Sequence, residues 1–222
     1  MISKASVPKA VFFDWDGTLA DSYAYLNEAH SHVLAELGFE PFKKDEFKDY
    51  FGKPREILYT KIYKHRSEEA KILFEKYVNE NCHKLTYVSG ADTLLKTIFD
   101  LGLPMGIVSN KKGSIVRREI GHFGWNGYFP TIVAAGEASE DKPSGAPLLM
   151  AIEQAGLAHL NKADIWYVGD TETDLRCARD ANCPVLLIAP YGIEKLNMRE
   201  YNPIKIADNC HHLLEFLVAI SR

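Results

Sequence analysis

Short apolar segments alternate with longer segments of helical spacing from residue 89 to the C-terminus. Apolar runs at 105–108, 131–135, 165–168 and 185–189 predict buried strands. Apolar residues at helical spacing predict helices at 94–101, 113–123, 146–155, 175–181 and 210–220. Strands separated by single helices pair in parallel and are covered on both faces. The sequence therefore predicts an α/β fold with a Rossmann-like parallel-sheet core, whose first strand is the apolar run at 10–13.

The segment between the first strand and this alternating region has a different pattern. After Ser22, a predicted helix cap, apolar positions follow helical spacing up to a stop at Gly38. Gly52-Lys53-Pro54 forms a break, and two further helices follow it, divided near Ser67. We interpret the chain as an α/β core domain, 1–19 and 88–222, with a small α-helical domain at 20–87 inserted after the first strand.

Two aspartates follow the first strand, one residue apart, in the sequence Asp14-Trp15-Asp16-Gly17. Side chains two residues apart share a face at a strand end, so both carboxylates are expected to point into one small volume. Two carboxylates there repel each other unless a cation lies between them or one holds a proton. The motif therefore indicates a site for cation-assisted chemistry.

Further chemically active residues lie at the ends of other predicted strands. Ser109 and Asp170 follow two of them, and Lys142 lies in the loop beyond a third. Ligands of open parallel sheets bind beyond the carboxyl ends of the strands, so these groups should converge with Asp14 on one edge. A nucleophilic carboxylate, a hydroxyl, an ammonium and a metal-binding acid together suit phosphoryl transfer.

The order of these motifs resembles that of the haloacid dehalogenase superfamily of phosphohydrolases. The motifs are DxDGT at 14–18, Ser109-Asn110 after a strand, Lys142-Pro143, and GDxxxD at 169–174. The inserted helices resemble the cap domain of the branch that includes phosphoglycolate phosphatases and β-phosphoglucomutases. This resemblance covers nearly the whole chain.

The resemblance implies catalytic roles. Asp14 would be the nucleophile that forms an aspartyl-phosphate, and Asp16 would protonate the leaving oxygen and then deprotonate the attacking water. It also implies that the phosphoryl group is bound by the following residues: Gly17, Thr18, Ser109, Asn110 and Lys142.

A magnesium site is implied as well. Asp14, the backbone carbonyl of Asp16, and Asp170 would hold Mg²⁺. Asp174 lies one helical turn beyond Asp170 and would reach the ion directly or through water. It is equally explained as an acid favoured in the first turn of a helix.

Two residues bear on the substrate. Arg55 aligns with an arginine that β-phosphoglucomutases use for a second phosphate. Arg55 or Lys53 is therefore a candidate contact for an anionic group of the substrate, and solvated helix-end charge explains both residues equally well. Trp15 resembles the tryptophan of phosphonoacetaldehyde hydrolases, which would make Lys53 a candidate Schiff base. Those enzymes have alanine where this chain has Asp16, and dehalogenases also lack that aspartate, so both activities are disfavoured.

The sequence thus predicts a Mg²⁺-dependent phosphatase for a small phosphate monoester of the phosphoglycolate or sugar phosphate type. A phosphomutase of the β-phosphoglucomutase type is the first alternative, because the same site would catalyse that reaction if the phosphate were transferred back to a sugar and not to water. A phosphonoacetaldehyde hydrolase and a non-catalytic module, which either holds a phospho-aspartate or serves only for binding, are weaker alternatives.

Composition and charge limit the classes of partner that we expect for this protein. The 222 residues carry a net charge of -4 without a long basic run, which argues against nucleic acid. No apolar stretch approaches the length of a membrane span or a signal peptide. Four cysteines without a CxxC pair indicate reduced thiols and a cytoplasmic location. We expect a small phosphorylated metabolite as partner, with the monomer and the homodimer both open.

Overall fold

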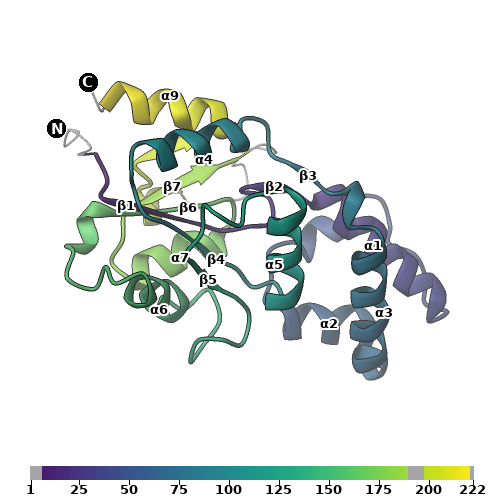
Figure 1. The fold of residues 1–222 in the computed structure, drawn as a ribbon. Coiled ribbons are helices and arrows are strands. Elements are labelled where there is room, and N and C mark those ends of the chain that lie inside the picture. Colours follow the sequence, from purple (N-terminus) through teal and green to yellow (C-terminus); the bar gives the residue numbers. More distant parts are fainter. Residues whose placement is uncertain (1–6, 190–197, 221–222) are drawn as a thin grey trace.

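The computed structural model describes residues 7–189 and 198–220 (Figure 1). Its centre is a six-stranded parallel sheet in the order β5-β4-β1-β6-β7-β8. The predicted α/β class is confirmed. The strands are β1 (Ala10–Phe13), β4 (Met105–Val108), β5 (Thr131–Val133), β6 (Ile165–Gly169), β7 (Val185–Ile188) and β8 (Lys205–Ala207).

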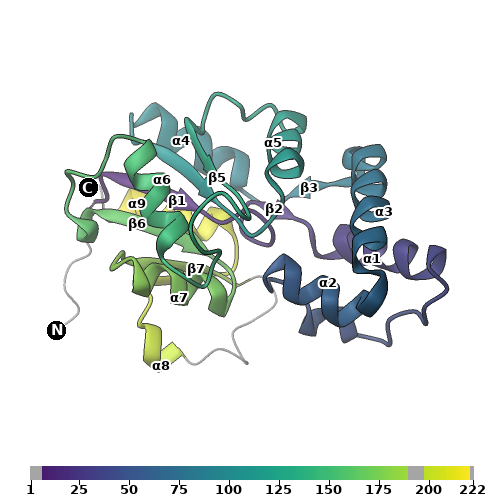
Figure 2. The same cartoon turned by 90° about the horizontal axis from the view of Figure 1, so that it is seen from below.

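Helices cover both faces of this sheet (Figures 1 and 2). In β1, Val11 and Phe13 belong to the apolar cluster on one face, whereas Ala10 and Phe12 belong to the cluster on the other. The first cluster includes residues of α4 (Ala91–Asp100), α5 (Gly113–His122) and α9 (Cys210–Ile220). The second includes residues of α6 (Ala146–Gln154) and α7 (Glu172–Asp180). Burial on both faces explains why β1 is continuously apolar.

A block of helices follows β1 and lies beside the sheet (Figure 2). It consists of α1 (Tyr23–Glu36), α2 (Arg55–Tyr63) and α3 (Ser67–Glu80), with short 3-10 segments at 46–49, 64–66 and 82–84. The chain enters it through β2 (Ala20–Asp21) and leaves it through β3 (Thr86–Tyr87), which pair in antiparallel fashion. The block occupies the place in the chain predicted for the inserted helices, and the division into domains at 19/20 and 87/88 stays a prediction.

Several local expectations were imperfect. Helix α7 begins at Glu172, three residues before its predicted start, because Thr171 and Asp174 supply polar partners for its first turn. The short strand β8 and helix α8 (Met198–Tyr201) were not predicted, since so few residues carry no clear periodicity. Among the described helices, none is long and apolar enough to cross a membrane.

Ser22 was expected to cap α1, and its side chain does not. It occupies the N-cap position with helical backbone angles, φ -100° and ψ -7°, whereas a capping side chain normally sits on an extended residue. Within the described residues its buried hydroxyl has no hydrogen-bond partner.

The helical block is organised around a buried histidine. His30 of α1 is 3% exposed, its Nδ1 lies 2.7 Å from the Tyr63 hydroxyl, and its ring lies against that of Phe74 with the centroids 4.5 Å apart. Burial lowers the pKa of His30 to about 3. The imidazole is therefore neutral at physiological pH.

We expect His30 to make the protein sensitive to acid. The unfolded chain binds a proton at this side chain near pH 6.5, whereas the folded chain binds it near pH 3, so stability is lost as pH falls through that window. Between pH 6.5 and 5.5 this histidine should remove about 1 kcal/mol from the free energy of unfolding. Urea denaturation of His30→Leu should show a shallower pH dependence than the wild type. His32→Leu, at an exposed position of the same helix, is the matched control.

Candidate active site

Three adjacent strands deliver polar side chains to one edge of the sheet. Asp14 follows β1, Ser109 follows β4 and Asp170 follows β6, and β1 lies between the other two strands. Phe13 pairs with both Ile107 and Val168, so these strands end at nearly the same level. Strands β4 and β6 lie on opposite sides of β1, so the order of the strands reverses direction at β1. This edge is therefore a topological switch point, where ligands of such sheets bind.

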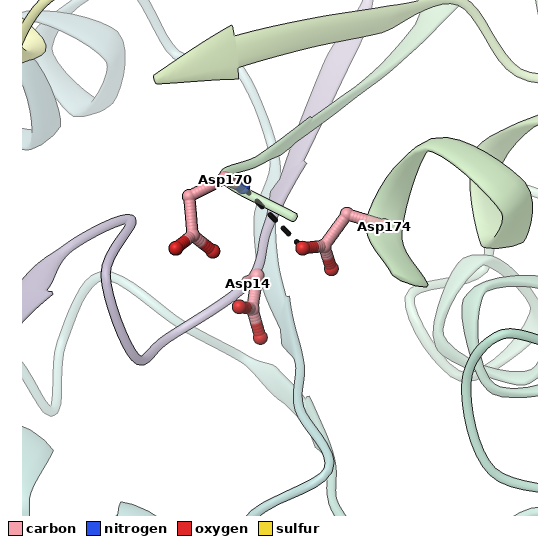
Figure 3. Close-up of side chains that lie close together, drawn as sticks. All are labelled: Asp14, Asp170 and Asp174. Atoms are coloured by element: carbon pink, nitrogen blue, oxygen red, sulfur yellow. Dashed lines mark hydrogen bonds between the residues drawn. The ribbon is translucent and has the colours of Figure 1, made fainter. Parts of the chain in front are cut away.

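Three carboxylates gather there. Asp14, Asp170 and Asp174 each place an oxygen within 4.8 Å of the others (Figure 3). The backbone N–H of Asp170 donates to Asp174 Oδ2 over 3.3 Å, which is the dashed line in the figure. Asp174 also accepts hydrogen bonds from the Thr171 hydroxyl at 2.6 Å and the Thr171 N–H at 3.0 Å. Asp174 is thus both an acid of the first helical turn and a member of the carboxylate cluster.

Lys142 joins this cluster as a buried cation. Its side chain is 3% exposed, and its Nζ lies 2.6 Å from Asp14 Oδ1 and 2.7 Å from Asp174 Oδ1. The ammonium also donates to the Tyr167 hydroxyl at 3.1 Å. Three hydrogen bonds satisfy all three of its donors.

The charges of the cluster do not balance. Burial, then the charge of Asp174, raises the pKa of Asp14 to about 7, although Lys142 opposes the shift. Burial, and then the charges of Asp174 and Asp14, raise the pKa of Asp170 well above its usual value. Burial would also raise the pKa of Asp174, but Lys142 and the bonds from Thr171 outweigh it and lower the pKa. One ammonium faces three carboxylates, and the hard oxygen donors fit a further cation such as Mg²⁺.

Gly17 and Thr18 lie against Asp170. The Thr18 hydroxyl donates to Asp170 Oδ1 over 3.3 Å, and its side chain is fully buried. A Cβ on Gly17 would lie 2.1 Å from Asp170 Oδ2, and its φ of +84° disfavours any other residue. Both were expected to bind the phosphoryl group; in this structure they pack against the carboxylate of Asp170.

Asp16 points to a different partner from Asp14. Its Oδ1 accepts a hydrogen bond from Lys111 Nζ at 2.8 Å, and Lys111 also pairs with Glu119 Oε2 at 2.7 Å. Glu119 Oε2 accepts from the Trp15 indole N–H at 2.6 Å. Lys111, Glu119 and Trp15 are all buried. The two aspartates of the motif therefore have different partners: Asp14 pairs with Lys142, and Asp16 pairs with Lys111.

A pocket of about 750 Å³, part of it open to solvent, lies between this edge and the helical block. Its walls include all but four of the predicted site residues, the exceptions being Gly17, Thr18, Asp170 and Asp174. The core contributes Asp14, Asp16, Ser109, Asn110 and Lys142, and the block contributes Lys53 and Arg55.

The break at Gly52 brings the helical block onto the core. Gly52 has a φ of +75°, and a Cβ there would lie 2.7 Å from the side chain of Thr171. Its carbonyl accepts a hydrogen bond from the Thr173 hydroxyl at 3.3 Å. Only glycine allows this close approach at the mouth of the pocket.

Sequence reasoning missed several residues of the site. Lys111 and Lys112 follow Ser109-Asn110 directly, and their place just past a strand end was a usable signal. Tyr167 on β6 and Glu119 on α5 carried no such signal, because each lies within an apolar or amphipathic element and its partners are distant in sequence.

Comparison with known proteins identifies the family. The family model described as "Haloacid dehalogenase-like hydrolase" matches residues 11–188, and the chain belongs to this family. A phosphoglycolate phosphatase of Aquifex aeolicus is 30% identical over 94% of this chain and 100% of its own length. One of Psychrobacter arcticus is 27% identical, with coverage of 94% and 95% respectively.

Solved structures share this fold. The crystal structure of a predicted phosphoglycolate phosphatase from Haemophilus somnus superposes with a TM-score of 0.84, at 21% identity, covering 95% of this chain and 98% of its own. The chain is thus a phosphoglycolate phosphatase-like hydrolase of the haloacid dehalogenase-like family.

We expect Glu119 to be a strong determinant of stability. Glu119→Ala leaves the buried Lys111 with one carboxylate and the Trp15 N–H without its acceptor, which should lower the free energy of unfolding by about 3 kcal/mol. Urea denaturation measures this loss. Asp100→Ala, which breaks an exposed ion pair with Lys96 on α4, should have a far smaller effect. Equal losses in the two variants would contradict a stabilising buried network.

Proposed function

We propose that this protein is a Mg²⁺-dependent phosphatase that hydrolyses a small phosphate monoester, of the phosphoglycolate or sugar phosphate type, through an aspartyl-phosphate. The observation that carries the proposal is the arrangement of Asp14, with the buried ammonium of Lys142 on one of its oxygens, at the floor of a pocket lined by Ser109 and Asn110. A carboxylate nucleophile, a fixed cation and neutral donors in one pocket suit attack on a phosphate.

The polar residues that line the pocket at the sheet edge each have a role in this mechanism. An ionised Asp14 oxygen attacks phosphorus, and the ester oxygen leaves with a proton from Asp16. Lys142 holds the nucleophile in place and, with Ser109 and Asn110, stabilises the charge on the phosphoryl oxygens. In the second step Asp16 takes a proton from water, which attacks phosphorus and releases phosphate from Asp14. Lys111, bonded to Asp16, orients this carboxylate in the pocket.

The carboxylate cluster is the proposed metal site. Asp14, Asp170 and the backbone carbonyl of Asp16 would hold Mg²⁺, with Asp174 acting directly or through water. An ion held there would neutralise charge on both the nucleophile and the phosphate, which otherwise repel. Supporting this are the unbalanced negative charge and the raised pKa values of Asp14 and Asp170.

A phosphomutase would use the same residues, transferring the phosphoryl group to a sugar in place of water. Dependence of turnover on glucose 1,6-bisphosphate would identify that activity. The proposed substrate contact of Arg55 serves either reaction, because its side chain lines the pocket.

Asp14→Asn should abolish hydrolysis, lowering kcat with p-nitrophenyl phosphate and Mg²⁺ by at least about 10³-fold, since an amide is a poor nucleophile. Release of p-nitrophenolate measures this. Asp164→Asn, which breaks an ion pair with Lys9 at the opposite end of β6, is the matched control and should retain activity. Folded wild type that neither hydrolyses this ester nor forms an aspartyl-phosphate from acetyl phosphate would refute the proposal.

Mg²⁺ should stabilise the protein more at high pH. Protons compete with the ion for Asp14 and Asp170, because the pKa of Asp14 is raised to about 7 and that of Asp170 is also raised. The rise in Tm caused by a fixed Mg²⁺ concentration should therefore be larger at pH 8 than at pH 6, as measured by scanning calorimetry. Asp170→Asn should lose most of the rise, and chelation with EDTA should reverse it. An equal rise at both pH values would contradict binding at these carboxylates.

A further inference from the structure

Glu75 of α3 holds two cations of the pocket wall at once. Its Oε1 lies 2.9 Å from Arg55 Nη2, and its two carboxylate oxygens lie 2.6 and 2.7 Å from Lys112 Nζ. Arg55 belongs to α2, whereas Lys112 is the residue that precedes α5 of the core. Arg55 and Lys112 both line the pocket. Glu75 therefore connects the helical block to the core at the place where the pocket meets both.

These three side chains leave one net positive charge on the wall. The side chains of Arg55, Glu75 and Lys112 are 21%, 26% and 40% exposed, so solvent screens them only in part. The Arg55 guanidinium also lies over the Tyr59 ring, 5.4 Å from its centroid, which restricts its position. A group bound against this wall meets two cations, one of which is offset by Glu75.

We propose that Glu75 is a specificity-determining residue, which makes the pocket select phosphate monoesters whose leaving group carries a single negative charge, such as a carboxylate. A second phosphate carries about two negative charges, and the single net positive charge that Arg55, Lys112 and Glu75 leave on this wall would balance only one of them. This inference rests on the proposed function and narrows its substrate class toward phosphorylated small acids and away from bisphosphates.

A structural role for Glu75 makes the opposite prediction. If the carboxylate only fastens the helical block to the core, its removal weakens the pocket and lowers activity on every substrate. If it sets the charge of the wall, its removal frees Arg55 and Lys112 and raises activity on substrates with more negative charge. A gain confined to one class of substrate does not arise from damage to the fold.

The test compares Glu75→Gln with the wild type on three esters in the presence of Mg²⁺. These are phosphoglycolate, with one carboxylate; glucose 1,6-bisphosphate, with a second phosphate; and phenyl phosphate, with a neutral leaving group. We expect kcat/KM for the bisphosphate to rise about tenfold relative to phenyl phosphate, and that for phosphoglycolate to change less. Lys112→Gln should lower kcat/KM for both anionic substrates relative to phenyl phosphate.

The matched control is Glu56→Gln on α2, which breaks an ion pair with Lys71 at an exposed position. It removes the same charge from the same block and should leave the ratios among the three substrates unchanged. Lys53, which also lines the pocket, is common to all variants and cancels from each comparison.

Calorimetric titration with glucose 1,6-bisphosphate gives a second readout that needs no turnover, with tighter binding expected for Glu75→Gln. A uniform loss of activity on all three esters, or unchanged ratios and unchanged affinity, would overturn the role of Glu75. Failure of the proposed function looks different: the wild type would hydrolyse none of the esters, while the titration would still decide whether Glu75 controls anion binding.

Discussion

The site depends on the burial of one ammonium group. Lys142 lies at the carboxyl edge of the sheet with almost no exposure, and a cation there is tolerated only because Asp14, Asp174 and Tyr167 accept its hydrogen bonds. The dependence is mutual, since the carboxylates would otherwise repel each other in a volume shielded from water. This arrangement fixes the oxygens of Asp14 and leaves negative charge for a further cation.

The chemistry and the choice of substrate come from different parts of the molecule. Strand ends of the sheet hold Asp14, Ser109 and the carboxylate cluster, whereas the helical block supplies much of the opposite wall of the pocket. Specific contacts between the two parts include Gly52 against Thr171 and Glu75 with Lys112. A change in the block can therefore alter which organic group fits without moving the nucleophile.

The sequence predicted the sheet and the residues at its edge because both follow from short-range pattern. Continuous apolar runs mark strands that are buried on both faces, and the residue after each run falls on the carboxyl edge whatever the rest of the fold does. The partner of each residue was not predictable in this way. Trp15 meets Glu119 across 104 positions of the chain, and Glu75 meets Lys112 across 37, and no local periodicity relates either pair.

The sequence by itself thus determined the fold class, the insertion of helices after the first strand, and the set of acidic, hydroxyl and lysine side chains available to the site. Only the tertiary structure decided how they are paired: Lys142 with Asp14, Lys111 with Asp16, and Glu75 with two cations of the pocket wall. The physical reason is that charge and hydrogen-bonding capacity belong to single residues, whereas burial, distance and the resulting pKa values arise only when distant segments pack together.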